Sequence, residues 1–182
     1  MNVPALRPAT EEDLERLVEV EVEAGRLFHS VGMSEMAGDV PDRRELLEAI
    51  HGERVWVAQV GAQVAGYVIA EVIDQNAHVA QVSVATEFAG RRIGQALIEL
   101  VEAWGRAAGR PATTLTTFRD IPWNGPYYRR LGYRELADEE IGSELARTIA
   151  DEAGLPGVDG SLRCAMIKPN STETVLSPVR GR

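Results

Sequence analysis

The pattern of hydrophobic and polar positions is clearest in residues 78–108. Valines recur along residues 78–84, and this density of β-branched side chains predicts a strand. From Ile93 onward, apolar side chains recur at spacings of three and four, which predicts a long amphipathic helix. Residues 88–94, between these two segments, contain two glycines and two arginines and predict a turn. The region is therefore expected to run from strand through turn to helix.

Similar patterns predict the remaining elements. Further strands are predicted at residues 5–8, 54–60, 64–73, 113–118, 133–136 and 162–168. Further helices are predicted from Thr10, at residues 41–50, within residues 122–132 and at residues 139–152. Residues 28–40 are expected to form a flexible loop that can include a helical turn. This order predicts one mixed α/β domain, a central sheet of about seven strands flanked by about four to five helices. We assign it to residues 1–169 and expect residues 170–182 to form a flexible C-terminal tail.

Composition narrows the class of protein. The chain has 182 residues, of which 45% are hydrophobic and 26% are charged, as expected for one soluble domain. No apolar run approaches the ~18 residues that a membrane span needs, and the single cysteine, Cys164, excludes an internal disulfide. These features favour a cytoplasmic location for the protein. The net charge of −9 argues against nucleic acid as a binding partner and suits a cationic substrate.

The turn at residues 88–94 is suited to bind an anion. The first amides of a helix have no partner within it, and the helix dipole places partial positive charge at that end. Arg91 and Arg92 add full charges there. The sequence contains no Gly-x-Gly-x-x-Gly after a strand and no Gly-Lys-Ser/Thr, so two familiar nucleotide-binding loops are excluded. The residues therefore predict a phosphate-bearing cofactor bound mainly by the backbone.

The segment Ala89-Gly90-Arg91-Arg92-Ile93-Gly94 resembles the acyl-CoA signature of the GNAT superfamily of N-acetyltransferases. That signature is Gln/Arg-x-x-Gly-x-Gly/Ala. The final glycine matches, whereas Ala89 and Arg92 depart from it. The context strengthens the resemblance: Val82-Ser83-Val84 comes before the turn, and residues 128–133 resemble the family's Tyr-x-x-x-Gly-Phe ending. The resemblance covers residues 5–168.

The resemblance implies a GNAT fold in which the fourth and fifth strands splay apart and hold acetyl-CoA, the co-substrate, without a metal. The pantetheine would pair with the strand before the turn, and the pyrophosphate would lie on the turn and the helix start. The residues implied in cofactor binding are Val82, Ser83, Val84, Ala89, Gly90, Arg91, Arg92, Ile93, Gly94, Gln95, Ala96, Asn124 and Tyr128. Arg92 stands where glycine is usual, so the backbone there is expected to favour a conformation that glycine enters more easily.

The resemblance also suggests catalytic roles. Tyr128 occupies the family's acid position and would protonate or hydrogen-bond the departing CoA thiolate, and the Val84 amide would stabilise the oxyanion. His78 matches the position of a catalytic glutamate in one branch of the family and is our candidate general base. Glu71, Asp74 and ordered water are the alternatives.

Other candidate residues leave alternatives open. Asn124 either caps the short helix that follows it or contacts CoA near its sulfur. Trp123 is either a core residue or a wall of the acceptor pocket, and an exposed loop position is favoured for His29.

The sequence therefore predicts an acetyltransferase acting on a primary amine of a small molecule, peptide or protein by direct attack. It does not identify that amine, and it does not decide between acetyl and longer acyl donors. The alternatives are a non-catalytic acyl-CoA sensor and an interaction protein in which the domain only scaffolds a dimer. We expect no nucleic acid and no membrane among the partners, and the sequence is compatible with a homodimer.

Overall fold

A central sheet of seven strands organises the protein, which we describe from a computed structural model covering residues 4–38 and 40–170. The strand order is β1-β2-β3-β4-β5-β7-β6, and only β4 and β5 pair in parallel among the described residues. The strands are β1 (Ala5–Pro8), β2 (Val55–Val60), β3 (Gln63–Ile73), β4 (Asn76–Val84), β5 (Ala112–Phe118), β6 (Arg134–Glu135) and β7 (Arg163–Pro169). The mixed sheet expected from the sequence is confirmed.

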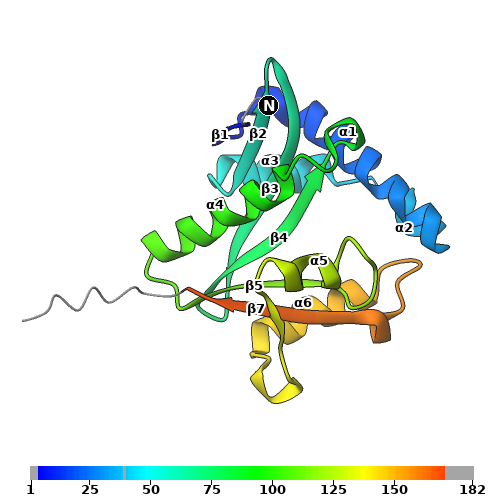
Figure 1. The fold of residues 1–182 in the computed structure, drawn as a ribbon, viewed down its shortest axis with the longest axis vertical. Coiled ribbons are helices and arrows are strands. Elements are labelled where there is room, and N and C mark those ends of the chain that lie inside the picture. Colours follow the sequence, from blue (N-terminus) through cyan, green and yellow to red (C-terminus); the bar gives the residue numbers. More distant parts are fainter. Residues whose placement is uncertain (1–3, 39, 171–182) are drawn as a thin grey trace, which may run out of the picture.

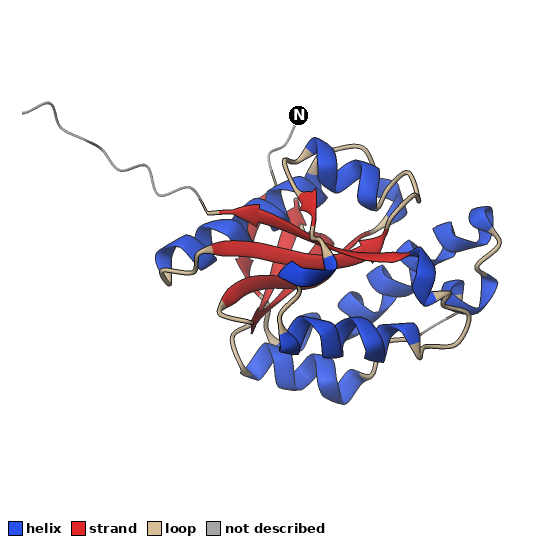
Figure 2. Ribbon diagram, turned by 90° about the horizontal axis from the view of Figure 1, so that it is seen from below, coloured by secondary structure: helices blue, strands red, loops and turns tan. Residues whose placement is uncertain are grey.

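Helices cover both faces of the sheet (Figure 2). They are α1 (Leu14–Gly25), α2 (Ser34–Ala37), α3 (Arg43–His51), α4 (Ile93–Ala107), α5 (Gly125–Arg130) and α6 (Ser143–Ala153). The described residues thus contain six α-helices, where about four to five were expected, and one of them is the short α2, the helical turn that the sequence allowed within residues 28–40. Residues 171–182, most of the expected tail, lie outside the described part of the chain.

Two helix starts differ from the sequence expectation for a local reason. Pro41 precedes α3 instead of opening it, because the Asp42 side chain caps the helix by accepting from the amides of Arg44 and Glu45. The last helix, α6, begins at Ser143 rather than near residue 139, because the stretch before it forms a short 3₁₀ turn. A segment's acidic composition does not by itself place the first residue of a helix.

β4 and β5 diverge, which opens the sheet at its centre (Figure 1). They pair only where Ala77–Val79 meets Thr113–Leu115, whereas β4 stays paired with β3 as far as Val84. The register of β3 and β4 shifts between Ile69 and Ala70, a bulge that adds twist where the strands separate. The second half of β4 therefore has a partner on one edge only. We call the opening beside this half the slot.

The core fixes β4 and α4 relative to each other. Leu97, Ile98 and Val101 of α4 are fully buried against the sheet, together with Val57 and Val68. Burial of a side chain of this size stabilises the fold by about 1.5–3 kcal/mol. The loop between β4 and α4 is thus held at both ends by rigid elements.

Candidate active site

The loop between β4 and α4 presents a row of backbone amides without protein partners. Within the described residues, the amides of residues 90–95 donate no hydrogen bond to a protein acceptor, and we call this segment the amide turn. The amide of Ala89 donates to the carbonyl of Thr86, and the amide of Ala96 donates to the carbonyl of Arg92, each at 3.1 Å. Of the amides predicted to bind the cofactor, those of Ala89 and Ala96 are therefore already used within the protein.

Two residues of the amide turn have left-handed backbone conformations. Gly90 has a φ of 75°, and Arg92, which precedes the first residue of α4, has a φ of 59°. This conformation costs a residue with a side chain about 1 kcal/mol. The expectation that the backbone at Arg92 suits glycine is thus confirmed, yet the turn forms with arginine. The Arg91 guanidinium stacks 5.2 Å from the centroid of the Phe88 ring and stays beside the turn.

Val82 and Val84 present their backbone groups to the slot. The amide of Ala85 donates to the carbonyl of Ala65 at 2.9 Å, so Ala85 faces β3. Residues of an antiparallel pair alternate in direction, so Ser83 also faces β3, whereas Val82 and Val84 face the opposite edge. Because β5 pairs with β4 only before this stretch, the amides and carbonyls of both valines are open to an extended ligand.

The short helix α5 brings two tyrosines to the amide turn. A side chain at Gly125 would collide with the backbone carbonyl of Arg119, so glycine lets α5 lie close to the end of β5. A Cβ at Gly94 would lie 3.3 Å from the hydroxyl of Tyr127. The rings of Tyr127 and Tyr128 pack edge to face with centroids 5.4 Å apart. The two sequence motifs that carry the resemblance are therefore adjacent in space.

Tyr128 lies in a buried setting beside the slot. Its side chain is 7% exposed, and its ring packs against that of Tyr133 with centroids 6.1 Å apart. Burial, with the neighbouring Tyr127, raises the pKa of Tyr128 well above its usual range. The hydroxyl makes no hydrogen bond to another described residue. It is therefore protonated at neutral pH and able to donate a hydrogen bond to a ligand.

Two buried polar atoms nearby have no protein partner. The Asn124 side chain makes no capping hydrogen bond to α5, and its Oδ1 is among the buried atoms without a described partner, so the capping alternative is not what the structure shows. Thr117 Oγ1 on β5 is also without a described partner. Thr116 bonds Glu152 of α6, so alternation directs Thr117 to the other face, that of α4 and α5. The sequence did not single out Thr117 among the four threonines of β5.

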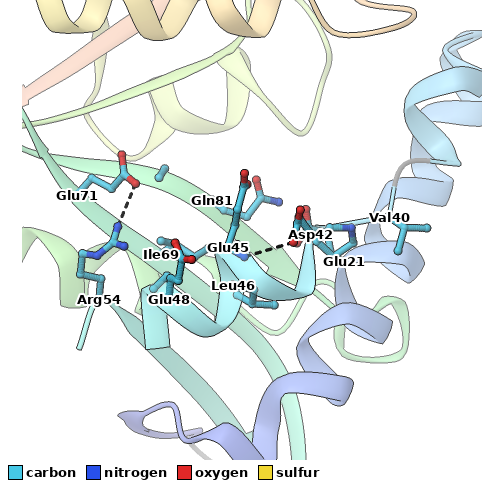
Figure 3. A pocket seen from close by; sticks show the side chains of 13 residues that line it. Glu21, Val40, Asp42, Glu45, Leu46, Glu48, Arg54, Ile69, Glu71 and Gln81 are labelled. Atoms are coloured by element: carbon cyan, nitrogen blue, oxygen red, sulfur yellow. Dashed lines mark hydrogen bonds and ion pairs between the residues drawn. The ribbon is translucent and has the colours of Figure 1, made fainter. Parts of the chain in front are cut away.

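The opposite side of β4 borders a cavity of about 600 Å³ between β3, β4 and α3 (Figure 3). Tyr67 bonds Glu21 of α1, which places the odd-numbered side chains of this part of β3 on the face of α1 and α3. Ala80 and Gln81 of β4 line the cavity where β5 separates from β4. Its charged lining comprises Glu21, Asp42, Glu45, Glu48, Arg54 and Glu71. We call it the acidic cavity.

Residues 51–135 match the family model described as an acetyltransferase (GNAT) domain. This chain carries a GNAT acetyltransferase domain. The matched segment contains the slot, the amide turn and α5, so the family inferred from the sequence is confirmed on the residues that carried the inference.

Solved structures share the fold of this GNAT domain. PaiA N-acetyltransferase from Thermoplasma acidophilum, in complex with coenzyme A, is 17% identical with a TM-score of 0.67, and the match covers 93% of this chain and 99% of that one. Ribosomal-protein-S18-alanine N-acetyltransferase from Escherichia coli is 14% identical with a TM-score of 0.65, covering 96% and 98%. N-acetylglutamate synthase from Neisseria gonorrhoeae is 12% identical with a TM-score of 0.70, covering 94% and 36%. At these identities the likeness shows the fold alone.

His78, the base candidate, is buried where β4 and β5 still pair. Its side chain is 1% exposed, and its Nδ1 lies 2.9 Å from the hydroxyl of Thr114. Burial lowers the pKa of His78 from 6.5 to about 4. The imidazole is therefore neutral at physiological pH and enclosed between strands. These surroundings favour a structural role for His78 over proton abstraction from an incoming amine.

The alternative bases occupy different environments. Asp74 accepts hydrogen bonds from the amides of Glu144 and Leu145 at 3.2 and 2.9 Å, so it caps the start of α6. Glu71 lines the acidic cavity, and its Oε1 lies 3.1 Å from Arg54. Of the three side chains considered as bases, Glu71 alone faces the cavity.

The remaining candidates have structural neighbours. Ser83 accepts a hydrogen bond from Gln81 at 2.9 Å on the face opposite α4, which separates its side chain from the amide turn. Trp123 packs edge to face on Phe28, with centroids 6.2 Å apart, and is not part of the acidic cavity's lining. Burial raises the pKa of Cys164 to about 11, which leaves its thiol protonated.

The described residues offer neither a metal site nor a membrane-spanning helix. Among the described residues, no group of three or more histidine, cysteine, aspartate or glutamate side chains is placed to hold a metal ion. In the same part of the chain, no helix is long and apolar enough to cross a membrane.

Proposed function

We propose that this GNAT domain transfers the acetyl group of acetyl-CoA to a primary amine by direct attack of the amine. The observation that carries the proposal is the amide turn, because residues 90–95 offer consecutive unpaired amides at the positive end of α4. Such a row of donors suits a pyrophosphate, and no other described residue accepts from it.

The residues around the slot fit the rest of an acyl-CoA. The open backbone edge of Val82 and Val84 can pair with the amides of a pantetheine arm, as an added strand would. Asn124 Oδ1 and Thr117 Oγ1 are buried acceptors whose hydrogen bonds the described residues do not supply. An unpaired buried polar atom costs about 1–3 kcal/mol, so a ligand that pairs with it gains affinity. A ligand with several amide groups thus matches this side of β4.

Three groups would serve the transfer itself. The Val84 amide faces the slot and would stabilise negative charge on the thioester oxygen. Because burial raises the pKa of Tyr128, we expect its hydroxyl to donate a hydrogen bond to the departing thiolate rather than to transfer its proton fully. A lysine-like ammonium has a pKa of about 10.4 and must lose a proton before attack. We assign that proton to Glu71 or to water held in the acidic cavity.

Calorimetric titration with CoA tests the proposal first. Binding with a dissociation constant of about 1–100 μM, in the range common for enzyme substrates, is expected. Absence of binding would remove the proposal. A thiol-release assay with a panel of amines then separates enzyme from sensor, because a sensor would bind CoA and release no thiol with any amine. Acetyl and longer acyl donors are compared in the same assay. Cytoplasmic location and a homodimer remain predictions from the sequence.

A further inference from the structure

We infer that the acceptor is an aliphatic diamine or polyamine, a molecule with at least two cationic amino groups, and that it binds in the acidic cavity. The inference rests on the proposed function, because the cavity borders the strand from which the acetyl group would be delivered. It adds the chemical class of the acceptor, which the fold and the family leave open.

The cavity has a strong excess of negative charge. Five carboxylates and one guanidinium line it, and that guanidinium, from Arg54, is paired with Glu71 at 3.1 Å. One carboxylate oxygen of Asp42 accepts hydrogen bonds from amides of α3, and Glu21 accepts a hydrogen bond from the Tyr67 hydroxyl. The lining contains no second cationic side chain to neutralise the four carboxylates that are not paired with Arg54. A cationic ligand would supply that balance.

Glu45 and Glu48 have carboxylates that no other described side chain neutralises. Neither carboxylate makes a hydrogen bond or ion pair with another described residue, and both side chains belong to the cavity lining (Figure 3). They are three residues apart on α3, where like charges repel each other and destabilise a helix. Neither arginine of α3 is paired with them: Arg43 bonds Glu15 of α1 at 3.1 Å, and Arg44 makes no ion pair with another described residue.

The position of the cavity suits acetyl transfer to one amino group of a diamine. Ala80 and Gln81 lie at its inner end, on the strand that continues into the slot, and the two unpaired glutamates lie on α3 at its other side. From the inner end, one amino group would be directed along β4 toward the thioester, while a second could pair with Glu45 or Glu48. Leu46 and Ile69 supply apolar lining between them for a methylene chain.

The size and charge of the cavity also select among amines. A volume of about 600 Å³ lies within the range of ~300–1,000 Å³ that small-molecule sites occupy. An amino acid acceptor brings its own carboxylate, which five acidic side chains would repel. A diamine has no negative charge. The length of its methylene chain determines whether its second amino group can reach a carboxylate of the cavity.

The test compares putrescine, a four-carbon diamine, with n-butylamine, which has the same chain and one amino group. We expect the wild-type enzyme to have a kcat/KM at least tenfold higher for putrescine. In the double variant Glu45→Gln with Glu48→Gln, this ratio should fall about tenfold, the upper size expected for two exposed ion pairs. Glu139→Gln, an exposed glutamate outside the cavity, removes one charge elsewhere and should leave the ratio unchanged.

Calorimetry supplies a readout that does not depend on turnover. Putrescine should bind the CoA-loaded protein, and the double variant should bind it at least fivefold more weakly while its affinity for CoA stays the same. Equal rates for both amines, or faster acetylation of a peptide amine, would overturn the inference and leave the acetyltransferase proposal standing. Failure of the wild-type protein to bind CoA would instead remove the proposed function.

Discussion

Under the proposed function, the two sides of β4 would recognise ligands in different ways. On the side of α4 and α5, recognition would rely mainly on the backbone: the amide turn and the edge of Val82 and Val84 need no particular side chain. On the side of α1 and α3, recognition would come from carboxylates on several elements. A backbone site persists through substitution as long as the turn keeps its shape, which explains how Ala89 and Arg92 stand where the family signature has other residues.

The difference also separates the two substrates. CoA is an anion, and the start of α4 offers it positive charge, whereas the acidic cavity would repel its phosphates. A cationic amine prefers the cavity for the same reason. Because the charged groups of the two sides are opposite in sign, each proposed substrate would be directed to its own side of the strand.

The largest predicted effect concerns His78, which lies buried where β4 and β5 still pair. Its pKa is about 4 in the folded protein and 6.5 when exposed, so the unfolded chain binds more protons between these values. The stability that neutral His78 provides is complete above pH 6.5 and is lost as pH falls toward 4. It amounts to about 3 kcal/mol at 1.4 kcal/mol per pKa unit.

Urea unfolding at several pH values measures this contribution. The free energy of unfolding of His78→Gln should decrease less than that of the wild type between pH 6.5 and 4, whatever its absolute stability. Parallel curves would show that His78 does not titrate in this way. The pH profile of kcat/KM provides the second check: if His78 were the base, the substitution would remove its acidic limb, and we expect that limb to remain.

Tyr128→Phe tests the hydrogen bond that the Tyr128 hydroxyl is proposed to donate to the departing thiolate. Removing the hydroxyl should lower kcat by about 10²-fold, the usual size of a general-acid contribution, and leave the affinity for CoA nearly unchanged. The matched control is Tyr127→Phe, which removes the adjacent hydroxyl at the amide turn and should change kcat by less than about threefold. If both variants turned over at the wild-type rate, Tyr128 would have no part in catalysis.

Gln95→Pro removes one amide of the amide turn and so tests the backbone site directly. Proline is tolerated in the first turn of a helix, and the amide of Gln95 has no protein acceptor to lose. We expect the affinity for CoA to fall about tenfold, which corresponds to one hydrogen bond to a charged group. Gln95→Ala is the control, because it loses the same side-chain contact to Glu99 and keeps the amide. Equal affinities in the two variants would contradict the account.

Arg92→Gly is expected to have the smallest effect. The substitution relieves the left-handed conformation at φ 59° but increases the freedom of the unfolded chain, so the two contributions nearly cancel. Stability should change by less than about 1 kcal/mol, and affinity for CoA by less than about threefold, because backbone groups make the contact. A large loss of affinity would show that the Arg92 side chain, rather than the turn, binds the phosphates.

The fold and the two segments that form the candidate donor site were largely predictable from the sequence. The periodicity of residues 78–108 encodes β4, the turn and α4 within one continuous stretch, and the resemblance pointed to the segment that begins at Tyr128, which lies beside that turn. The acidic cavity was not predicted, because Glu21, Glu48 and Glu71 meet only after α1, α3 and β3 have packed.

Burial was the other quantity that the sequence did not provide. The sequence pattern of a strand is the same whether a histidine in it is buried or exposed. Only the folded structure, in which its side chain is 1% exposed and contacts Thr114, shows that His78 is enclosed. Asp74, likewise, caps a helix that starts about 70 residues later in the chain, a partnership that no local pattern predicts.

Amide chemical shifts of the ¹⁵N-labelled protein, followed through separate titrations with CoA and with putrescine, test the two-sided account most directly. CoA should shift the resonances of residues 90–95 together with Val82 and Val84, and putrescine should shift those of α3 and of Ala80 and Gln81. Shifts from both ligands at the same set of residues, or no shift at the amide turn on adding CoA, would contradict the account.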